Sequence, residues 1–267
     1  MPGPANGTAR RTGFPVAPVL APCTIRPPIF MHLQLHMLRQ PTDSSCGPTC
    51  LHAIYRYFGV EYDLAQLIDE IPQFEDGGTL SVHLAQHALR RGFDARLVTY
   101  NLRIFDPTWW CLGPRDMIAK LQARLEHLQN DKARHSHRAY VEFLELGGQL
   151  DFFDLDPDSL ERLLAHGAPI LTGLSATYLY QHPRELPDGR DDDVAGSPTG
   201  HFVVVNGWHA ESAQVLVMDP FEQNPFNPQG EYRVGVHRFI NSVMLGILTY
   251  DANLLVVTPP RARRAHA

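Results

Sequence analysis

The sequence has few cysteines, no excess of basic residues and no long apolar run, and each absence excludes a class of protein. Its 267 residues include only four cysteines, too few for a disulfide framework in a chain of this length. The formal net charge is −6, whereas nucleic-acid binders usually carry a basic face. No segment reaches the run of about 20 apolar residues needed to cross a bilayer. We therefore expect a cytoplasmic protein without nucleic-acid or membrane partners.

Composition divides the chain into a proline-rich beginning, a globular middle and a basic end. Seven of the 22 prolines fall within residues 1–30, an expected disordered leader, and Met31 competes with Met1 as the natural start. Residues 261–267 are expected to be a basic tail. Between them, residues 31–260 are predicted to form one α+β domain, helical first and strand-rich later. The oligomeric state stays open, because the sequence contains no repeat, heptad or docking motif.

A short helix predicted from Cys46 to Tyr57 begins at the first candidate functional residue. Ser44 or Ser45 can cap this helix, which puts Cys46 at the positive end of the helix dipole. That position favours the thiolate, the nucleophilic form of cysteine in acyl transfer. Gln40 lies six residues earlier on an extended segment. We expect its side-chain amide to sit beside the Cys46 backbone N–H, where the two donors would stabilise an oxyanion.

A hairpin is predicted to supply the second half of the site. Residues 202–205 and 214–218 are apolar and rich in β-branched side chains, and a polar, glycine-containing turn over 206–213 joins them. A hairpin centred near residue 210 would place His201 directly opposite Asp219, with Cβ atoms about 4.5–5.5 Å apart. A slip of one residue would turn one partner to the other face. His201 would serve as the general base and Asp219 as the group that orients it.

The two fragments together resemble a known peptidase family. The first contains Gln40, Cys46-Gly47-Pro48 and Phe58-Gly59, and the second runs from Gly200-His201 to Asp219-Pro220. This pattern is similar to that of the papain-like C39 peptidases over roughly residues 34–60 and 199–222. The resemblance implies a papain-like fold with a nucleophile helix packed on an antiparallel sheet. It also implies an oxyanion donor, a nucleophile, a general base and an orienter at Gln40, Cys46, His201 and Asp219, in that order.

Three departures limit what the resemblance implies. Ser45 occupies the position before the nucleophile, where the family commonly has aspartate. The separation of Cys46 from His201 exceeds that of minimal domains, which predicts an insertion around residues 101–150. The sequence has no transporter segment and no nucleotide-binding loop, so removal of leader peptides coupled to export does not follow.

The expected activity is cysteine-dependent hydrolysis of a peptide or amide bond through a Cys46–His201–Asp219 triad and a thioester. The substrate would be a peptide or protein, and no metal or organic cofactor is required. His83 and His87 have the spacing of a helical metal pair, but they lack the zinc-protease glutamate and a third ligand. Two alternatives stay open, a papain-like acyl transferase and a non-catalytic binding or regulatory module. Substrate and cleavage specificity also stay open.

Overall fold

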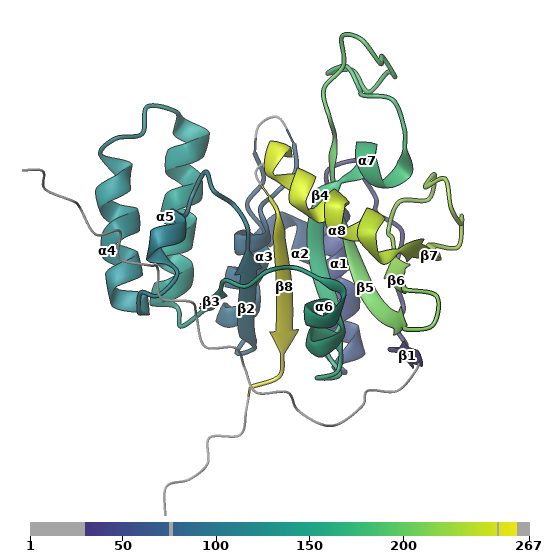
Figure 1. Ribbon diagram of the computed structural model, residues 1–267, viewed down its shortest axis with the longest axis horizontal. Coiled ribbons are helices and arrows are strands. Elements are labelled where there is room, and N and C mark those ends of the chain that lie inside the picture. The colour runs from purple at the N-terminus through teal and green to yellow at the C-terminus, as the bar shows by residue number, and fades with distance from the viewer. Residues whose placement is uncertain (1–29, 75–76, 250, 261–267) are drawn as a thin grey trace, which may run out of the picture.

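The computed structural model describes residues 30–74, 77–249 and 251–260, with helices on both faces of one sheet (Figure 1). The elements in chain order are β1 (Phe30–His32), α1 (Cys46–Tyr57), α2 (Leu64–Glu70), α3 (Ser81–Arg90), β2 (Asp94–Thr99), η1 (Pro107–Trp109), α4 (Pro114–Leu125), α5 (Asp131–Glu145), β3 (Gln149–Asp151), α6 (Pro157–Leu164), β4 (Ile170–Ser175), α7 (Ala176–Tyr180), β5 (Gly200–His209), β6 (Gln214–Met218), β7 (Glu231–Gly235), α8 (Val236–Leu245), η2 (Gly246–Thr249) and β8 (Asn253–Thr258). The predicted tail and all but the last residue of the predicted leader lie outside the described residues.

The sheet has the strand order β3-β2-β8-β4-β5-β6-β7. Its neighbouring strands are antiparallel except β2 and β3, which run parallel. The long strand β5 pairs with β4 over residues 200–205, and β1 takes the place of β4 beside residues 207–209. β5 therefore ties the beginning of the described chain to the middle of the sheet.

Alternating side chains of β5 divide the core into two layers. Phe202 and Val204 belong to the layer that α1 and α3 cover. Val203 and Val205 belong to the opposite layer, which α6 and α8 cover. In Figure 1, α6 and α8 lie in front of the sheet and α1 lies behind it. The predicted α+β class is confirmed, with the helix that begins at Cys46 packed on a largely antiparallel sheet.

A polar network around the buried His87 links the helices α1, α2 and α3. The Tyr55 hydroxyl on α1 is 2.7 Å from His87 Nδ1 on α3, and His87 Nε2 is 2.9 Å from a Glu70 carboxylate oxygen at the end of α2. Both ring nitrogens of His87 therefore have partners. The network gives this buried histidine a structural role and satisfies its polar atoms.

The segment predicted to be an insertion folds largely as a pair of helices. The polar residues 130–138 are compatible with either a break after an amphipathic helix or its continuation. The structure has a break, and the Asn130 side chain accepts the Ala133 N–H as the N-cap of α5. Gln86 on α3 donates to the Ala139 carbonyl at 2.7 Å, so α5 packs on the first helical layer. That this segment is an insertion stays a prediction.

Two predicted boundaries are wrong. The apolar residues from 168 to 179 predict a strand, but β4 ends at Ser175, where the Ser175 hydroxyl accepts the Tyr178 N–H and α7 begins. The turn expected over residues 206–213 is shorter, because β5 continues to His209 after a β-bulge between Val205 and Gly207. Within the described residues, no helix is both long and apolar enough to cross a membrane.

Candidate active site

Cys46 is the first residue of α1 and is only 6% exposed. Ser45 occupies the N-cap position, but the prediction of a side-chain cap is wrong. Its hydroxyl instead donates to the Thr42 carbonyl at 2.8 Å and accepts the Thr42 N–H at 3.0 Å. The loop before the helix is thereby closed on itself. The first-turn N–H groups of α1 are consequently left without a side-chain acceptor from Ser45.

Gly47 allows the start of α1 to pack closely against two other elements. A Cβ at this position would lie 2.9 Å from Thr79 Cγ2 and 3.1 Å from Phe202 Cδ2. Both distances are shorter than ordinary carbon contacts. The absence of a side chain at residue 47 therefore brings Cys46 close to β5, the strand that carries His201.

His201 and Asp219 form the predicted pair, although the predicted register is wrong. His201 Nε2 lies 2.8 Å from Asp219 Oδ1. In the sheet, Val204 is opposite Met218, so continuing this register would put Asp219 opposite Val203 rather than His201. A displacement of two residues keeps both side chains on the same face, and diagonal neighbours remain within reach. The pair therefore forms despite the shifted register.

The charges of this pair support one another. Burial alone would lower the pKa of His201, but the Asp219 carboxylate and the nearby Cys46 sulfur raise it to about 10. Burial alone would raise the pKa of Asp219, but His201, the Tyr180 hydroxyl and the Phe221 N–H together hold it below its usual value. The pair is therefore charged at neutral pH. Because Asp219 occupies Nε2, Nδ1 is the ring nitrogen left for Cys46.

Gln40 lies beside this pair but already has hydrogen-bond partners. Its backbone N–H donates to the Pro220 carbonyl at 3.0 Å, which fixes it next to the segment that follows Asp219. Its Nε2 donates to the Thr42 carbonyl at 3.1 Å and approaches the Asp43 carbonyl at 3.5 Å. Among the described residues, its buried Oε1 has no hydrogen-bond partner. Gln40, the predicted oxyanion donor, thus lies near the site, and its Nε2 is hydrogen bonded to the Thr42 carbonyl.

Sequence reasoning missed three further groups around Asp219. The Tyr180 and Tyr232 hydroxyls donate to Asp219 Oδ2 at 2.7 and 2.8 Å, and the Phe221 N–H donates to Oδ1 at 2.9 Å. Tyr180 comes from α7, a helix that the sequence did not predict. Asp-Pro-Phe at 219–221 is a local signal of a turn that folds an N–H back on a carboxylate. The two tyrosines carry no such local signal.

The other described cysteines have different surroundings. Cys50 is fully buried one turn after Cys46, and its thiol donates to the Phe202 carbonyl at 3.3 Å. Burial, with smaller contributions from Cys46 and Asp219, raises the pKa of Cys50 well above its usual value, so this thiol stays protonated. Cys111 is exposed. Cys23 lies outside the described residues.

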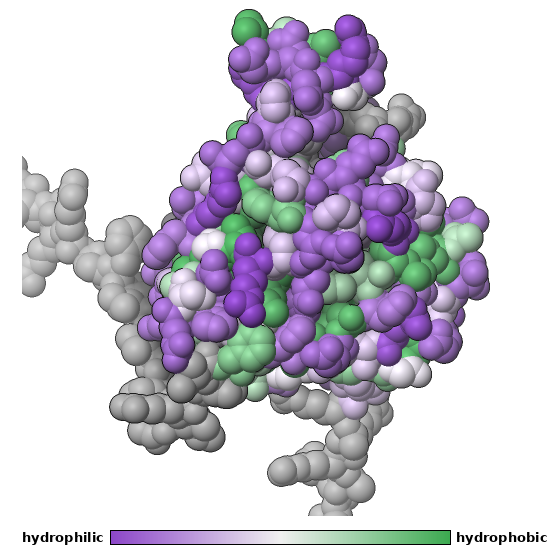
Figure 2. Space-filling model, turned by 90° about the vertical axis from the view of Figure 1, so that its right-hand side faces the viewer, coloured by the Kyte–Doolittle hydropathy of each residue, from purple (hydrophilic) through white to green (hydrophobic). Residues whose placement is uncertain are grey.

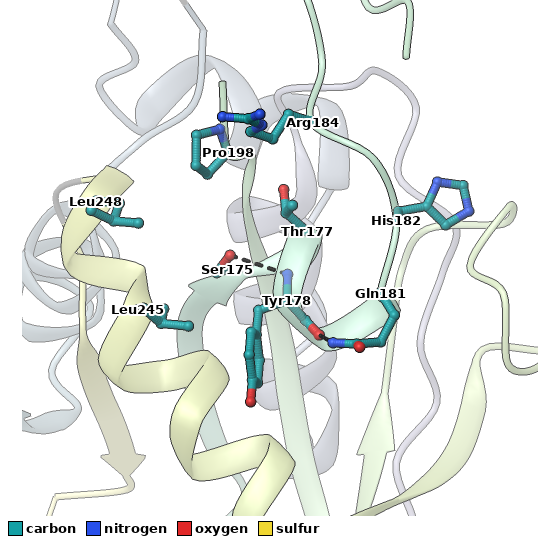
Figure 3. A pocket seen from close by; sticks show the side chains of 9 residues that line it. All are labelled: Ser175, Thr177, Tyr178, Gln181, His182, Arg184, Pro198, Leu245 and Leu248. Atoms are coloured by element: carbon teal, nitrogen blue, oxygen red, sulfur yellow. Dashed lines mark hydrogen bonds between the residues drawn. The ribbon is translucent and has the colours of Figure 1, made fainter. Parts of the chain in front are cut away.

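A groove lies between α7, α8 and the segment that follows α7 (Figure 3). Its volume is about 380 Å³, and Tyr178, Leu245 and Leu248 are among the side chains that line it. Ser175 also lines it and pairs in the sheet with Gly200, the residue before His201. Figure 2 shows that the segment between α7 and β5 protrudes from the molecule and is mostly polar.

The described residues contain no cluster of three or more His, Cys, Asp or Glu side chains arranged to hold a metal ion. The candidate pair His83 and His87 instead has protein partners. His83 Nε2 is 3.0 Å from His135 Nε2, and His83 Nδ1 is 3.2 Å from Gln86 Oε1. His87 belongs to the network with Tyr55. Both histidines thus link helices.

Comparison with known proteins gives one family and several solved structures. Residues 34–127 match the model of the Peptidase C39 family. This range includes Gln40 and Cys46 and ends before His201 and Asp219. The sequence matches no curated protein.

Three solved structures are similar in overall shape. The peptidase domain of Streptococcus ComA, a bifunctional ABC transporter involved in quorum sensing, has 14% identity and a TM-score of 0.41, covering 85% of this chain and 99% of that one. A double-glycine-motif protease from an AMS/PCAT transporter, solved with its leader peptide, has 12% identity and a TM-score of 0.40, covering 86% and 94%. Xylellain, a cysteine protease from Xylella fastidiosa, has 14% identity and a TM-score of 0.46, covering 88% of each chain.

These low identities and TM-scores assign no activity, substrate or residue role to this chain. The family match rests on the sequence alone and covers less than half of the chain. Within that range it identifies a peptidase family. The resemblance to the C39 peptidases is confirmed over residues 34–127.

Proposed function

We propose that this protein is a cytoplasmic cysteine peptidase that hydrolyses a peptide or amide bond with Cys46, His201 and Asp219. The observation that carries the proposal is the 2.8 Å contact between His201 Nε2 and Asp219 Oδ1 beside a cysteine at a helix N-terminus. A nucleophile, a base and an orienter in contact are the requirement for thiol catalysis. The match of residues 34–127 to a peptidase family supports the same chemistry.

The first half of the proposed reaction forms a thioester. With the thiol proton already held by His201, the Cys46 sulfur attacks the carbonyl carbon of the scissile bond. The carbonyl oxygen becomes an oxyanion, which accepts hydrogen bonds from the Cys46 N–H and from a Gln40 Nε2 hydrogen. The longer contact of Nε2 with Asp43 is the one that this hydrogen would give up. When the intermediate collapses, the C–N bond breaks and the leaving amine takes the proton from His201.

The second half of the proposed reaction releases the acid. His201 takes a proton from a water molecule as the water oxygen attacks the thioester carbonyl. The second tetrahedral intermediate expels the Cys46 sulfur, and the carboxylic acid leaves. The proton taken from water stays on His201, which restores the starting state of the site. The raised pKa of His201 supports a resting site in which the imidazole ring is protonated.

The proposed organisation follows the same reasoning. One domain spans residues 31–260, with an insertion around 101–150 that includes α4 and α5, and β1 begins at Phe30, the last residue of the proposed leader. The three described cysteines are free, which agrees with a reducing compartment. The proposed substrate is a peptide or protein, held without a metal or organic cofactor.

Turnover of a peptide library by purified protein tests this function. We expect Cys46→Ala and His201→Ala to abolish cleavage, Asp219→Asn to reduce it less, and Gln40→Ala to lower kcat more than it raises KM. Cys111→Ala is the matched control, because Cys111 is an exposed thiol outside the site. Cleavage by Cys46→Ala at the wild-type rate would overturn the proposal.

The same assay separates the alternatives. Adding a primary amine or a thiol diverts an acyl transferase toward the coupled product, whereas a hydrolase gives mainly the free acid. A protein that binds peptides and gives neither product, with Cys46 no more reactive than Cys111, would be a binding module.

A further inference from the structure

Asp219 is a buried carboxylate whose acceptor sites are all occupied by protein donors. Only 3% of the residue is exposed. Oδ1 accepts from His201 Nε2 at 2.8 Å and from the Phe221 N–H at 2.9 Å. Oδ2 accepts from the Tyr180 and Tyr232 hydroxyls at 2.7 and 2.8 Å. An ionised carboxylate has about four lone-pair sites, so these four donors saturate it.

We propose that Tyr180 and Tyr232 are positioning residues that keep the Asp219 carboxylate ionised and fix its orientation toward His201. This inference rests on the proposed function, in which Asp219 orients the base. His201 and the Phe221 N–H both bind Oδ1, so neither of them holds Oδ2. The two phenols are the groups that fix Oδ2, and rotation of the carboxylate would break both of their hydrogen bonds at once.

The two hydroxyls reach Asp219 from separate parts of the fold. Tyr180 is the last residue of α7, and Tyr232 lies in β7. Their rings are packed against the same partner, because the Phe226 ring centroid is 6.0 Å from that of Tyr180 and 4.6 Å from that of Tyr232. Tyr180 also stacks on Phe221 at 6.5 Å. The aromatic cluster holds each hydroxyl in place before any substrate binds.

The electrostatics agree with this role. Moving a carboxylate out of water strongly disfavours its charged form unless donors replace the lost hydration. Burial, followed by the Asp219 charge, raises the pKa of both tyrosines, so both hydroxyls are donors at neutral pH. The titratable groups that face Asp219 come from four elements: Cys50 on α1, Tyr180 on α7, His201 on β5 and Tyr232 on β7. Cys46 on α1 faces His201.

The test uses Tyr180→Phe, Tyr232→Phe and the double variant in the full chain, since phenylalanine keeps the ring and removes only the hydroxyl. Proton NMR of protein with labelled histidine follows the His201 Nε2–H as the pH is lowered, with assignment by His201→Ala. The change of this resonance at acid pH reports protonation of Asp219. We expect its midpoint to rise by about one pH unit for each hydroxyl removed. We also expect kcat of the double variant to fall about tenfold, with little change in KM.

Two controls separate positioning from general damage. Tyr178→Phe removes a hydroxyl from the same helix that does not contact Asp219, and it should leave the His201 midpoint unchanged. In an Asp219→Asn background, the Tyr180 and Tyr232 substitutions should no longer shift the acid-side midpoint of the His201 resonance. Thermal unfolding checks that each variant is folded, and either single variant suffices if the other does not fold.

An unchanged His201 midpoint in both folded single variants would overturn the inference. The same is true of shifts that persist in the Asp219→Asn background. Failure of the proposed function is a distinct result, because a wild-type protein that cleaves no peptide still has a His201 resonance to titrate.

Discussion

Replacing Asp251 with asparagine should remove a pH-dependent loss of stability of about 3 kcal/mol. Asp251 is 4% exposed, and its carboxylate accepts hydrogen bonds from the Ser81 hydroxyl and, at 2.7 Å, from Asn253 Nδ2. Both partners are uncharged. Burial raises the pKa of Asp251 from the usual 3.8 to about 6, against the smaller lowering effect of Ser81 and Asn253.

The sign and size of the effect follow from linkage. The folded protein binds this proton more tightly than the unfolded chain, so the stabilising contribution is complete below pH 3.8 and is lost as the pH rises through about 6. A shift of about two units corresponds to about 3 kcal/mol, because each unit is worth about 1.4 kcal/mol. Asparagine has no proton to lose, so its contribution is constant over this range.

The assay is urea unfolding of the wild type and Asp251→Asn at several values from pH 4 to pH 7. The quantity of interest is the difference between the two free energies of unfolding, because His83 acts in the opposite direction over the same range. Burial lowers the pKa of His83 from 6.5 to about 4, so its contribution is present above pH 6.5 and lost as the pH falls through about 4. The wild-type curve alone can therefore look flat.

Between pH 4 and pH 7 the difference should change by about 2 kcal/mol, which is most of the full effect, in favour of asparagine at the higher pH. A constant offset of any size reports only the altered hydrogen bonds with Ser81 and Asn253. Asp69→Asn, an exposed position on α2, is the matched control and should give a flat difference. A flat difference for Asp251→Asn as well would refute the reasoning.

Two further substitutions test the packing around the site. Gly47→Ala should destabilise the fold by about 1 kcal/mol in the same urea assay, because the new methyl lies 2.9 Å from Thr79 Cγ2 and the overpacking outweighs the helix propensity of alanine. The control is Gly113→Ala, whose methyl meets nothing within 4 Å and should be nearly neutral. Tyr55→Phe should cost about 1–3 kcal/mol by leaving His87 Nδ1 buried without its partner. Tyr57→Phe, which removes an exposed hydroxyl bonded to the Gly167 carbonyl, should cost less, and equal losses would contradict the role given to the network.

Short stretches of sequence were enough to predict the helix that begins at Cys46 and the contact of His201 with Asp219. The bounds of α1 agree with the prediction. The signals that define this helix, the spacing of its apolar residues and the glycine after its last turn, are all local in the sequence. The contact of His201 with Asp219 was also anticipated, since a displacement of two residues preserves the face of a strand. Those features required no knowledge of the rest of the chain.

Contacts between distant segments decided the parts that the sequence did not predict. The bulge that shifts the hairpin occurs where β1 pairs with β5, and a Cβ at Gly207 would lie 2.5 Å from the Met31 carbonyl oxygen. Asn206 at the bulge donates to the Glu231 carboxylate at 2.7 Å. The tyrosines around Asp219 likewise come from α7 and β7. No local pattern specifies such pairings, because they form only when the sheet is assembled.

The reactivity of Cys46 tests the central claim most directly. Wild type and His201→Ala are treated at neutral pH with a limiting amount of a thiol-directed electrophile, and mass spectrometry of the peptides measures the labelling rate of each cysteine. Cys111 serves as an internal reference because it is exposed and free. We expect Cys46, although only 6% exposed, to react faster than Cys111 in the wild type and slower in His201→Ala. A Cys46 that reacts more slowly than Cys111 in the wild type, or at the same rate with and without His201, would contradict the account.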